Sequence, residues 1–178
     1  MSAHNPDFDE SHIPKAFFIS FRCYGTWLHG DARGSVDTLH NTYRTPFLSP
    51  SPKLEVEKRQ MLKSAPIKLD AIRRSIVEAA IRETCAIRNW WLLALSVRTE
   101  HAHTVVDTGA RDPEKTMNAF KANATRKMIE AGVWRQGQKP WSRHGSTRWL
   151  WTTRSVDCAI EYVINGQGDD LPNFDDWK

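Results

Sequence analysis

Residues 91–107 constrain the fold of this chain more than any other segment. Two apolar runs, 91–98 and 101–107, are separated by only two polar residues, which predicts two strands joined by a tight hairpin. His101 and His103 stand at the start of the second run. Because side chains at i and i+2 leave the same face of a strand, both imidazoles are expected to point to one place, where they could hold one metal ion. A helix would place them about 200° apart, so this expectation depends on the strand.

Length and composition indicate one globular domain. The chain has 178 residues, of which 40% are hydrophobic and 26% charged, enough to build a core without disulfides. Three separated cysteines with no CxxC spacing argue against a disulfide framework and a zinc finger. We expect residues 1–13 to form a loose arm, 14–168 the domain and 169–178 an acidic tail. The polar start is untypical of a secretory signal and no apolar run reaches membrane-spanning length, so a cytoplasmic protein without a membrane partner is expected.

Residues 111–154 combine basic side chains with tryptophans, although the formal net charge of the whole chain is only +4. Cations bind phosphates and flat rings stack on bases, so this mixture is typical of single-stranded nucleic-acid binding. A solvated basic surface with core tryptophans is the alternative. The residues concerned are Arg111, Lys115, Lys121, Arg126, Lys127, Arg135, Lys139, Arg143, Arg148 and Arg154, with Trp134, Trp141, Trp149 and Trp151.

The hydrophobic pattern predicts an α+β fold with the order β-α-β-β-α-β and a final helix. This order favours a ferredoxin-like, RRM-type antiparallel sheet with helices on one face, in which the first strand and the histidine strand are the central pair. The long segment 25–52 is expected to be a loop that is either functional or partly mobile. The expected elements are a strand at 15–24, a short helix at 52–63, helices begun by the N-caps Asp70 and Asp112 and ended near Asn89 and Gly132, a strand at 148–153, and a helix begun by Ser155 and ended near Asn165.

The last predicted helix carries one of the three tyrosines of the chain, Tyr162. The apolar face of this helix comprises Val156, Ala159, Ile160, Val163 and Ile164, and Tyr162 falls about 140° from its centre. A tyrosine that only fills a core would lie on that face, so the Tyr162 hydroxyl is expected to be accessible. A surface tyrosine without a chemical role is the alternative. HExxH, P-loop and nucleophile-elbow patterns are absent from the sequence.

Four segments resemble motifs of one family, in the order that the family has them. Residues 100–106, EHAHTVV, look like the His-hydrophobic-His motif of HUH endonucleases, and residues 159–165, AIEYVIN, resemble the tyrosine helix of the single-tyrosine transposases, including the REP-associated group. Residues 120–126, FKANATR, are similar to the Lys-x-x-x-(Ser/Thr)-Arg helix between those motifs. Residues 141–146, WSRHGS, resemble the tryptophan-led segment before the last strand of the family.

This resemblance implies a metal-dependent single-stranded DNA endonuclease and strand transferase. His101 and His103 would hold Mg²⁺ or Mn²⁺, and Tyr162 would attack phosphorus, leaving a free 3′-OH and a 5′-phosphotyrosine link. The third ligand of the family is commonly a Gln or Asn four residues after the tyrosine, where this chain has a glycine. We choose Gln167 as the third ligand, and Asn165 is its competitor.

The resemblance also implies a single-stranded DNA partner that contains a hairpin. A monomer and a homodimer both fit, with the tyrosine acting in its own subunit or in the other. Two further functions stay open: a catalytically inactive single-stranded nucleic-acid-binding module on the same fold, and a divalent-metal hydrolase of small phosphate esters, against which the large basic, Trp-rich segment argues. The residues expected to contact DNA are Lys121, Arg126, Arg143, His144 and Arg22.

Overall fold

The computed structural model describes residues 13–31 and 49–168 of the chain. Within them, four antiparallel strands form one sheet in the order β2-β3-β1-β4. This confirms the α+β class, the ferredoxin-like strand order and the central pair of first strand and histidine strand. The elements are β1 (Ala16–Cys23), α1 (Pro52–Gln60), α2 (Ala71–Arg88), β2 (Trp91–Val97), β3 (His101–Asp107), α3 (Pro113–Glu130), β4 (Trp141–Leu150) and α4 (Thr153–Asn165).

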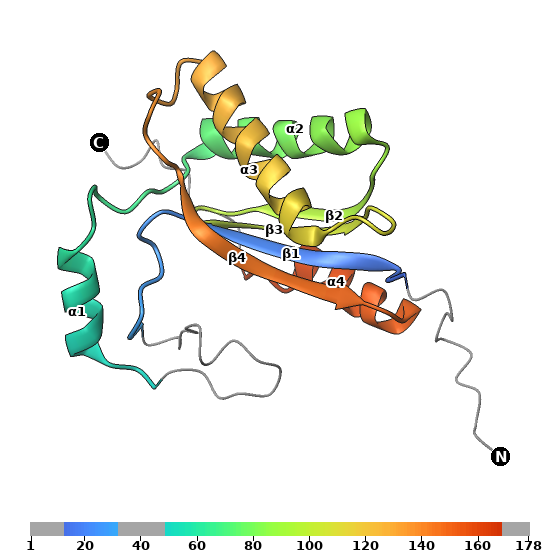
Figure 1. The fold of residues 1–178 in the computed structure, drawn as a ribbon, viewed down its shortest axis with the longest axis horizontal. Helices are drawn as coiled ribbons and strands as arrows, with labels where there is room; N and C mark the ends of the chain where they lie inside the picture. The colour runs from blue at the N-terminus through green and yellow to red at the C-terminus, as the bar shows by residue number, and fades with distance from the viewer. Residues whose placement is uncertain (1–12, 32–48, 169–178) are drawn as a thin grey trace.

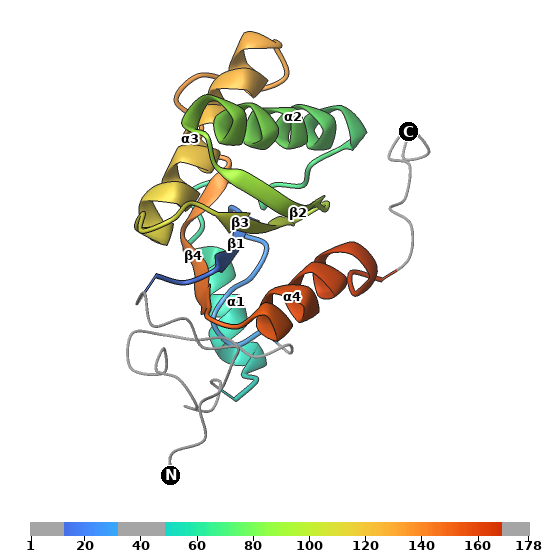
Figure 2. The same cartoon turned by 90° about the vertical axis from the view of Figure 1, so that its right-hand side faces the viewer.

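The sheet separates two layers of helices. Helices α2 and α3 cover one face, whereas α4 crosses the opposite face (Figures 1 and 2). The alternation of β1 produces this division, because Phe17, Ile19 and Phe21 belong to the core under α2 and α3. Ala16 belongs to a second, smaller core under α4, and Phe18 packs against it. The two faces of one strand therefore serve two different helix layers.

Helix α4 is held to the sheet by a short apolar contact. Val156 and Val163 are buried in the second core, and each such side chain stabilises the fold by roughly 1.5–3 kcal/mol relative to an exposed one. The expected cap is wrong by three residues: Thr152, not Ser155, is the N-cap, and Ser155 completes a capping box with it. Ile164, which the helical wheel places on the apolar face, is 62% exposed because it lies at the outer edge of this contact.

The predicted N-caps of the two longer helices are confirmed. Asp70 accepts a hydrogen bond from the Arg73 backbone and Asp112 from the Glu114 backbone. Each carboxylate satisfies an amide that has no partner within the helix. The boundaries predicted for α2 and α3 therefore agree with the structure to within a few residues.

The last strand differs from the prediction. It runs from Trp141 to Leu150, so it begins seven residues before the predicted 148–153 and ends three residues earlier. Its register with β1 shifts between the pairs Phe21–Gly145 and Cys23–Trp141. This irregular stretch of polar residues hides the alternation by which a strand is recognised.

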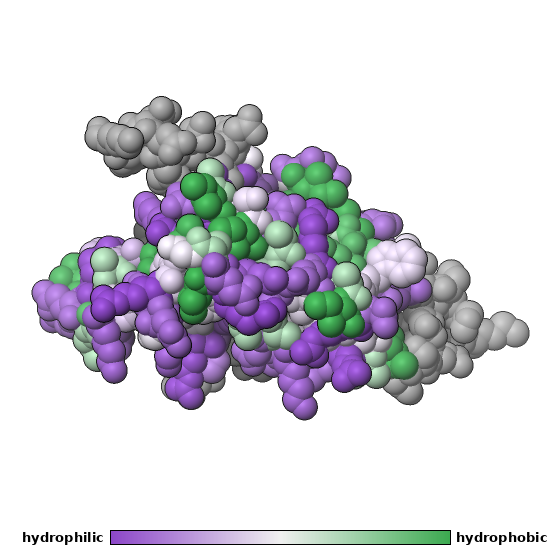
Figure 3. Space-filling view, turned by 90° about the horizontal axis from the view of Figure 1, so that it is seen from above, coloured by the Kyte–Doolittle hydropathy of each residue, from purple (hydrophilic) through white to green (hydrophobic). Residues whose placement is uncertain are grey.

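The face over α2 and α3 is mostly hydrophilic and carries its apolar side chains in separate patches (Figure 3). No helix among the described residues is long and apolar enough to cross a membrane. The described residues leave out three predicted segments: residues 1–12 of the arm predicted at 1–13, residues 32–48 of the predicted 25–52 loop, and the predicted acidic tail 169–178.

Candidate functional site

The two histidines of β3 lie side by side on the sheet face that α4 crosses. Alternation sends Ala102, Thr104 and Val106 to the other side, where Ala102 and Val106 join the main core. The ring centroids of His101 and His103 are 4.6 Å apart. The predicted placement of both imidazoles at one point is therefore present in the structure.

Ser20 of the neighbouring strand fixes the orientation of His103. The two residues are direct cross-strand partners, and Ser20 Oγ lies 2.6 Å from His103 Nδ1. On the other side, the ring of Phe18 stacks on the His103 ring with centroids 5.5 Å apart. When the proton is on Nδ1, the imidazole donates to Ser20 and its Nε2 carries a free lone pair.

Burial keeps both histidines neutral. Desolvation lowers the pKa of His103 to about 3, with further lowering by His101, Arg22 and Arg98. Desolvation also lowers the pKa of His101, and the hydrogen bond with Gln167 opposes this shift. Because a metal binds the neutral imidazole, both rings carry a usable lone pair at neutral pH.

The end of α4 brings Gln167, and not Asn165, to the histidines. Gln167 Oε1 lies 3.3 Å from His101 Nε2, and Gln167 Nε2 donates to the Tyr162 carbonyl at 3.2 Å. Asn165 instead donates to Glu161 at 2.8 Å. The helix stops at Gly166, whose backbone N–H donates to the Tyr162 carbonyl, and the turn that follows redirects Gln167 toward β3.

Position 166 is a glycine because the backbone there passes too close to Tyr162 for a side chain. A Cβ built on Gly166 would lie 2.8 Å from both Cδ2 and the carbonyl oxygen of Tyr162. Real Cβ atoms do not approach so closely, so a side chain there would displace the tyrosine ring. The chain therefore offers an amide one residue later, at Gln167.

Tyr162 lies beside His103 and remains accessible. Its ring centroid is 5.8 Å from that of His103 and 5.9 Å from that of Phe18, and 47% of the residue is exposed. The expected accessibility of the hydroxyl is confirmed. Phe18 touches both rings, so one side chain of β1 sets the spacing between the tyrosine and the histidine pair.

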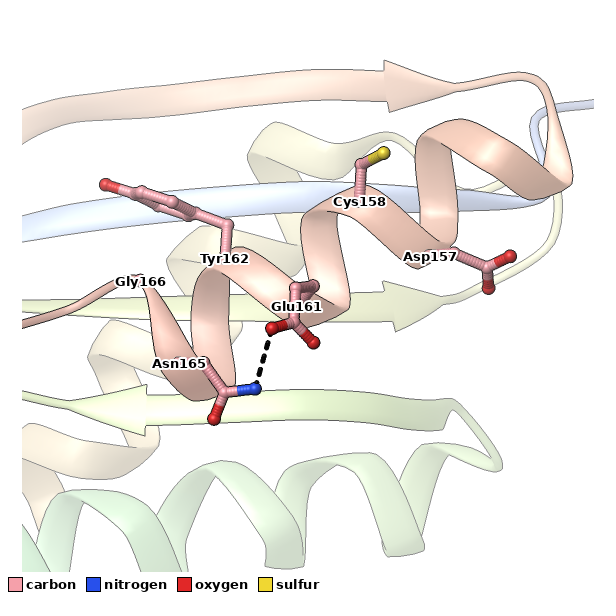
Figure 4. Close-up of a pocket in the computed structure, with 6 residues that line it drawn as sticks. All are labelled: Asp157, Cys158, Glu161, Tyr162, Asn165 and Gly166. Carbon is pink, nitrogen blue, oxygen red and sulfur yellow. Dashed lines mark hydrogen bonds between the residues drawn. The ribbon is translucent and has the colours of Figure 1, made fainter.

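An open hollow of about 620 Å³ adjoins the outer side of the tyrosine. Figure 4 shows Tyr162 and Asn165 leaving α4 on different sides. The hollow also contains the carboxylates of Asp157 and Glu161, which repel phosphates. This side of Tyr162 therefore disfavours anionic ligands.

The donor set around the histidines fits a divalent metal. No cluster of three or more His, Cys, Asp or Glu occurs in the described residues, but His101, His103 and Gln167 together offer two imidazole nitrogens and an amide oxygen. Two ligands of one octahedral Mg²⁺ or Mn²⁺ lie about 3 Å apart, close to the 3.3 Å between His101 Nε2 and Gln167 Oε1. The same three residues are those chosen from the sequence.

Two arginines give the site a positive potential. Arg22 is the cross-strand partner of His101, and its guanidinium lies 3.1 Å above the centre of the Trp27 ring. Its charge, together with that of Arg98, lowers the pKa of both histidines. Of the residues expected to contact DNA, Arg22 is therefore the one that lies beside the histidines.

Lys121 has a role inside the fold. It is only 7% exposed, and its ammonium donates to the carbonyls of Ser142 and His144 at 3.0 and 3.2 Å. Burial lowers its pKa. This arrangement contradicts the predicted phosphate contact of Lys121, because the charge is used to hold the irregular part of β4.

The other expected DNA contacts do not converge on the histidines. Arg126 lies on α3, across the sheet from α4, and its guanidinium contacts Asn123 and Glu130. Arg143 and His144 are exposed on β4, in the stretch whose carbonyls Lys121 holds. The structure thus places Arg22 at the site and Arg126 away from it.

The four tryptophans of the basic segment have different environments. Trp141 is buried and donates to the Lys121 carbonyl, and Trp134 donates to the Gln138 carbonyl beside Arg73. Trp149 and Trp151 stack on each other with ring centroids 5.5 Å apart. The alternative of core tryptophans is therefore right for Trp141, whereas Trp149 is exposed and Trp151 is half-buried.

The sequence interpretation overlooked Ser20 and Phe18. Both lie on β1 and face the histidines rather than the main core. A signal was present, because Ser20 is a hydroxyl within an otherwise apolar and aromatic run, and the expected central pairing of the two strands would have placed it opposite β3.

Two solved structures are similar to this chain. A REP-associated tyrosine transposase bound to a REP hairpin matches with a TM-score of 0.45 and 12% identity, over 92% of this chain and 70% of that chain. A candidate transposase from Deinococcus radiodurans R1 matches with a TM-score of 0.42 and 13% identity, over 88% of this chain and 93% of that chain. No protein-family model and no curated protein sequence matches the chain.

Proposed function

We propose that this protein is a metal-dependent single-stranded DNA endonuclease and strand transferase of the HUH single-tyrosine transposase type. The observation that carries the proposal is the meeting of Tyr162 with His103, His101 and Gln167 on one sheet face, at the distances given above. These residues come from β3, from α4 and from the turn after it, so no local pattern requires them to meet. The segments that contain His101, His103 and Tyr162 are the ones that resemble the family's motifs in the sequence.

The residues of the chain account for binding and cleavage as follows. The positive charge of Arg22 attracts the DNA backbone to the histidine side of Tyr162. The tyrosine oxygen attacks the phosphorus and loses its proton to solvent; an O–P bond forms, the bond from phosphorus to the 3′ oxygen breaks, and that oxygen takes a proton to become 3′-OH. Because the phosphotyrosine ester keeps the bond energy, a later attack by a 3′-OH reseals a strand without a nucleotide cofactor.

His101, His103 and Gln167 are the residues that would hold Mg²⁺ or Mn²⁺, which when bound polarises the scissile phosphate and neutralises its developing charge. Ser20 keeps one nitrogen of His103 occupied, so that the other faces the site. The carboxylates of Asp157 and Glu161 close the far side of Tyr162 to phosphate. The tyrosine lies beside the histidine of its own chain, which supports cleavage within one subunit, whether monomer or homodimer.

The proposal is tested by incubating the protein with single-stranded DNA from the flanks of its own gene, labelled at the 3′ end. A label that stays on the protein in denaturing gels in Mn²⁺, and not in EDTA, is the expected result. A hairpin-containing strand is compared with its duplex and with a strand lacking the hairpin. Binding without any covalent product would instead support a catalytically inactive binding module.

Replacing Ser20 by alanine is expected to weaken Mn²⁺ binding by about tenfold or more, because outer partners of a metal-bound histidine contribute that much to affinity. The variant removes the 2.6 Å hydrogen bond that fixes His103. Calorimetric titration with Mn²⁺ measures the affinity, and nitrogen NMR shifts of the imidazole report its tautomer.

Ser146→Ala is the matched control for this variant. Ser146 is the cross-strand partner of Ser20 on the other side of β1 and is exposed. It should bind Mn²⁺ as the parent protein does. Equal affinity of the Ser20 variant and the parent would refute the positioning role of Ser20.

A further inference from the structure

The stacked pair of Trp149, which is exposed, and Trp151, which is half-buried, forms an aromatic surface that the proposed cleavage mechanism does not use. Their ring planes are 23° from parallel with centroids 5.5 Å apart. The ring of Phe17 meets Trp149 edge-on at 5.3 Å and so holds the pair in place from below. Trp149 is nevertheless 50% exposed, a large amount of apolar surface for a side chain in a fixed position.

Basic residues neighbour this pair in the chain and in the sheet. Lys15, Arg148 and Arg154 are exposed, and the Lys15 backbone donates to Leu150, between the two tryptophans in sequence. Within the described parts of the chain, none of these three cations forms an ion pair with a carboxylate. A flat ring pair, with cations close to it in the chain that form no ion pair within the described residues, matches a ligand that carries both planar bases and phosphates.

A path connects the tryptophans to the tyrosine. Arg148 precedes Trp149 on β4 and is the cross-strand partner of Phe18. The ring of Phe18 contacts Tyr162, so Arg148 lies between the tryptophans and the site. Strand β4 is the outermost strand of the sheet, and side chains alternate across it, so Arg148 lies on the face of Tyr162 while Trp149 lies on the other. A strand that leaves the tyrosine can therefore pass Arg148 and bend around the edge of β4.

We propose that Trp149 and Trp151 stack with unpaired bases of the DNA strand that is bound at Tyr162, while Lys15, Arg148 and Arg154 contact its phosphates. This inference rests on the proposed function, which supplies single-stranded DNA as the ligand. Stacking is indifferent to base identity, because every base has a flat face. The pair thus adds affinity for single-stranded over duplex DNA, whose bases are already stacked on one another.

The test measures binding separately from cleavage. Tyr162→Phe protein, which cannot form the covalent product, is titrated into a fluorescent oligothymidine, and anisotropy gives the dissociation constant. Trp149→Ala and Trp151→Ala in this background are expected to weaken binding by about tenfold each. Trp149→Phe, which keeps a flat ring on Phe17, should recover most of the affinity and shows that loss of folding is not the cause.

Two controls make the outcome decisive. Trp91→Ala removes a tryptophan that is 75% exposed on β2, at the opposite edge of the sheet, and should bind like the parent. An oligonucleotide with abasic sites should bind the parent and the Trp149→Ala variant equally. The inference fails if Trp149→Ala and Trp151→Ala bind oligothymidine as tightly as the parent does. It also fails if these variants lose as much affinity for abasic DNA as for oligothymidine. The proposed function fails separately, if protein with Tyr162 intact gives no covalent product.

Discussion

Replacing Tyr162 by phenylalanine is expected to abolish the covalent protein–DNA product, with a loss of at least about a thousandfold in its rate of formation. The variant removes only the oxygen that attacks phosphorus. Its ring keeps the contacts with Phe18 and His103, so the affinity for single-stranded DNA should change by no more than about twofold. The product is measured in denaturing gels with DNA labelled at its 3′ end, and affinity by anisotropy.

Tyr24→Phe is the matched control. Its hydroxyl accepts a hydrogen bond from the Lys63 backbone, in the segment between α1 and α2, and the variant should form the product at the rate of the parent. A product that survives Tyr162→Phe would assign the nucleophile to another residue. If cleavage occurs within one subunit, mixing Tyr162→Phe with His103→Ala chains should restore no product, whereas exchange of α4 between subunits would restore it.

The strands and helices that rest on strong local signals could be predicted from the sequence. Two apolar runs with a two-residue break define the β2–β3 hairpin, and the N-caps Asp70 and Asp112 define the starts of two helices. The off-face position of Tyr162 on α4 and the common direction of the i, i+2 pair on β3 follow from periodicity as well, but their meeting does not. Periodicity gives the direction in which a side chain points, but not its distance from residues of another element.

What could not be predicted depends on contacts between distant segments. Lys121 lies next to the apolar face of α3 by helical spacing, and only the carbonyls exposed by the irregular β4 draw its ammonium inward. Gln167 is chosen from the sequence as the third site residue, but the turn that brings it to His101 is seen only in the structure. A continuous helix would carry Gln167 to the apolar side, but the stop at Gly166 reverses this. A side chain at 166 would meet the tyrosine ring, so position 166 has no room for an amide ligand.

Replacing Gly145 by alanine is expected to destabilise the fold by about 2–4 kcal/mol, the range of a severe overpacking change. The added Cβ would clash with Met117 Sδ and with the carbonyl oxygen of Ser20. The methionine can rotate away, but the carbonyl belongs to β1, which is paired on both sides. The gain of about 0.4–1 kcal/mol from the smaller freedom of the unfolded chain is too small to offset this.

The free energy of unfolding is measured in urea by tryptophan fluorescence. Ser146→Thr adds one methyl group to the next residue of the same strand, at an exposed position, and should change stability by less than about 0.5 kcal/mol. An unchanged or raised urea midpoint for Gly145→Ala would mean that β1 yields at Ser20. Because the Ser20 side chain holds His103, Gly145→Ala should also weaken Mn²⁺ binding in the fraction that stays folded. If Gly145→Ala lowers stability but leaves Mn²⁺ binding unchanged, the packing of β1 against β4 and the positioning of His103 by Ser20 are independent.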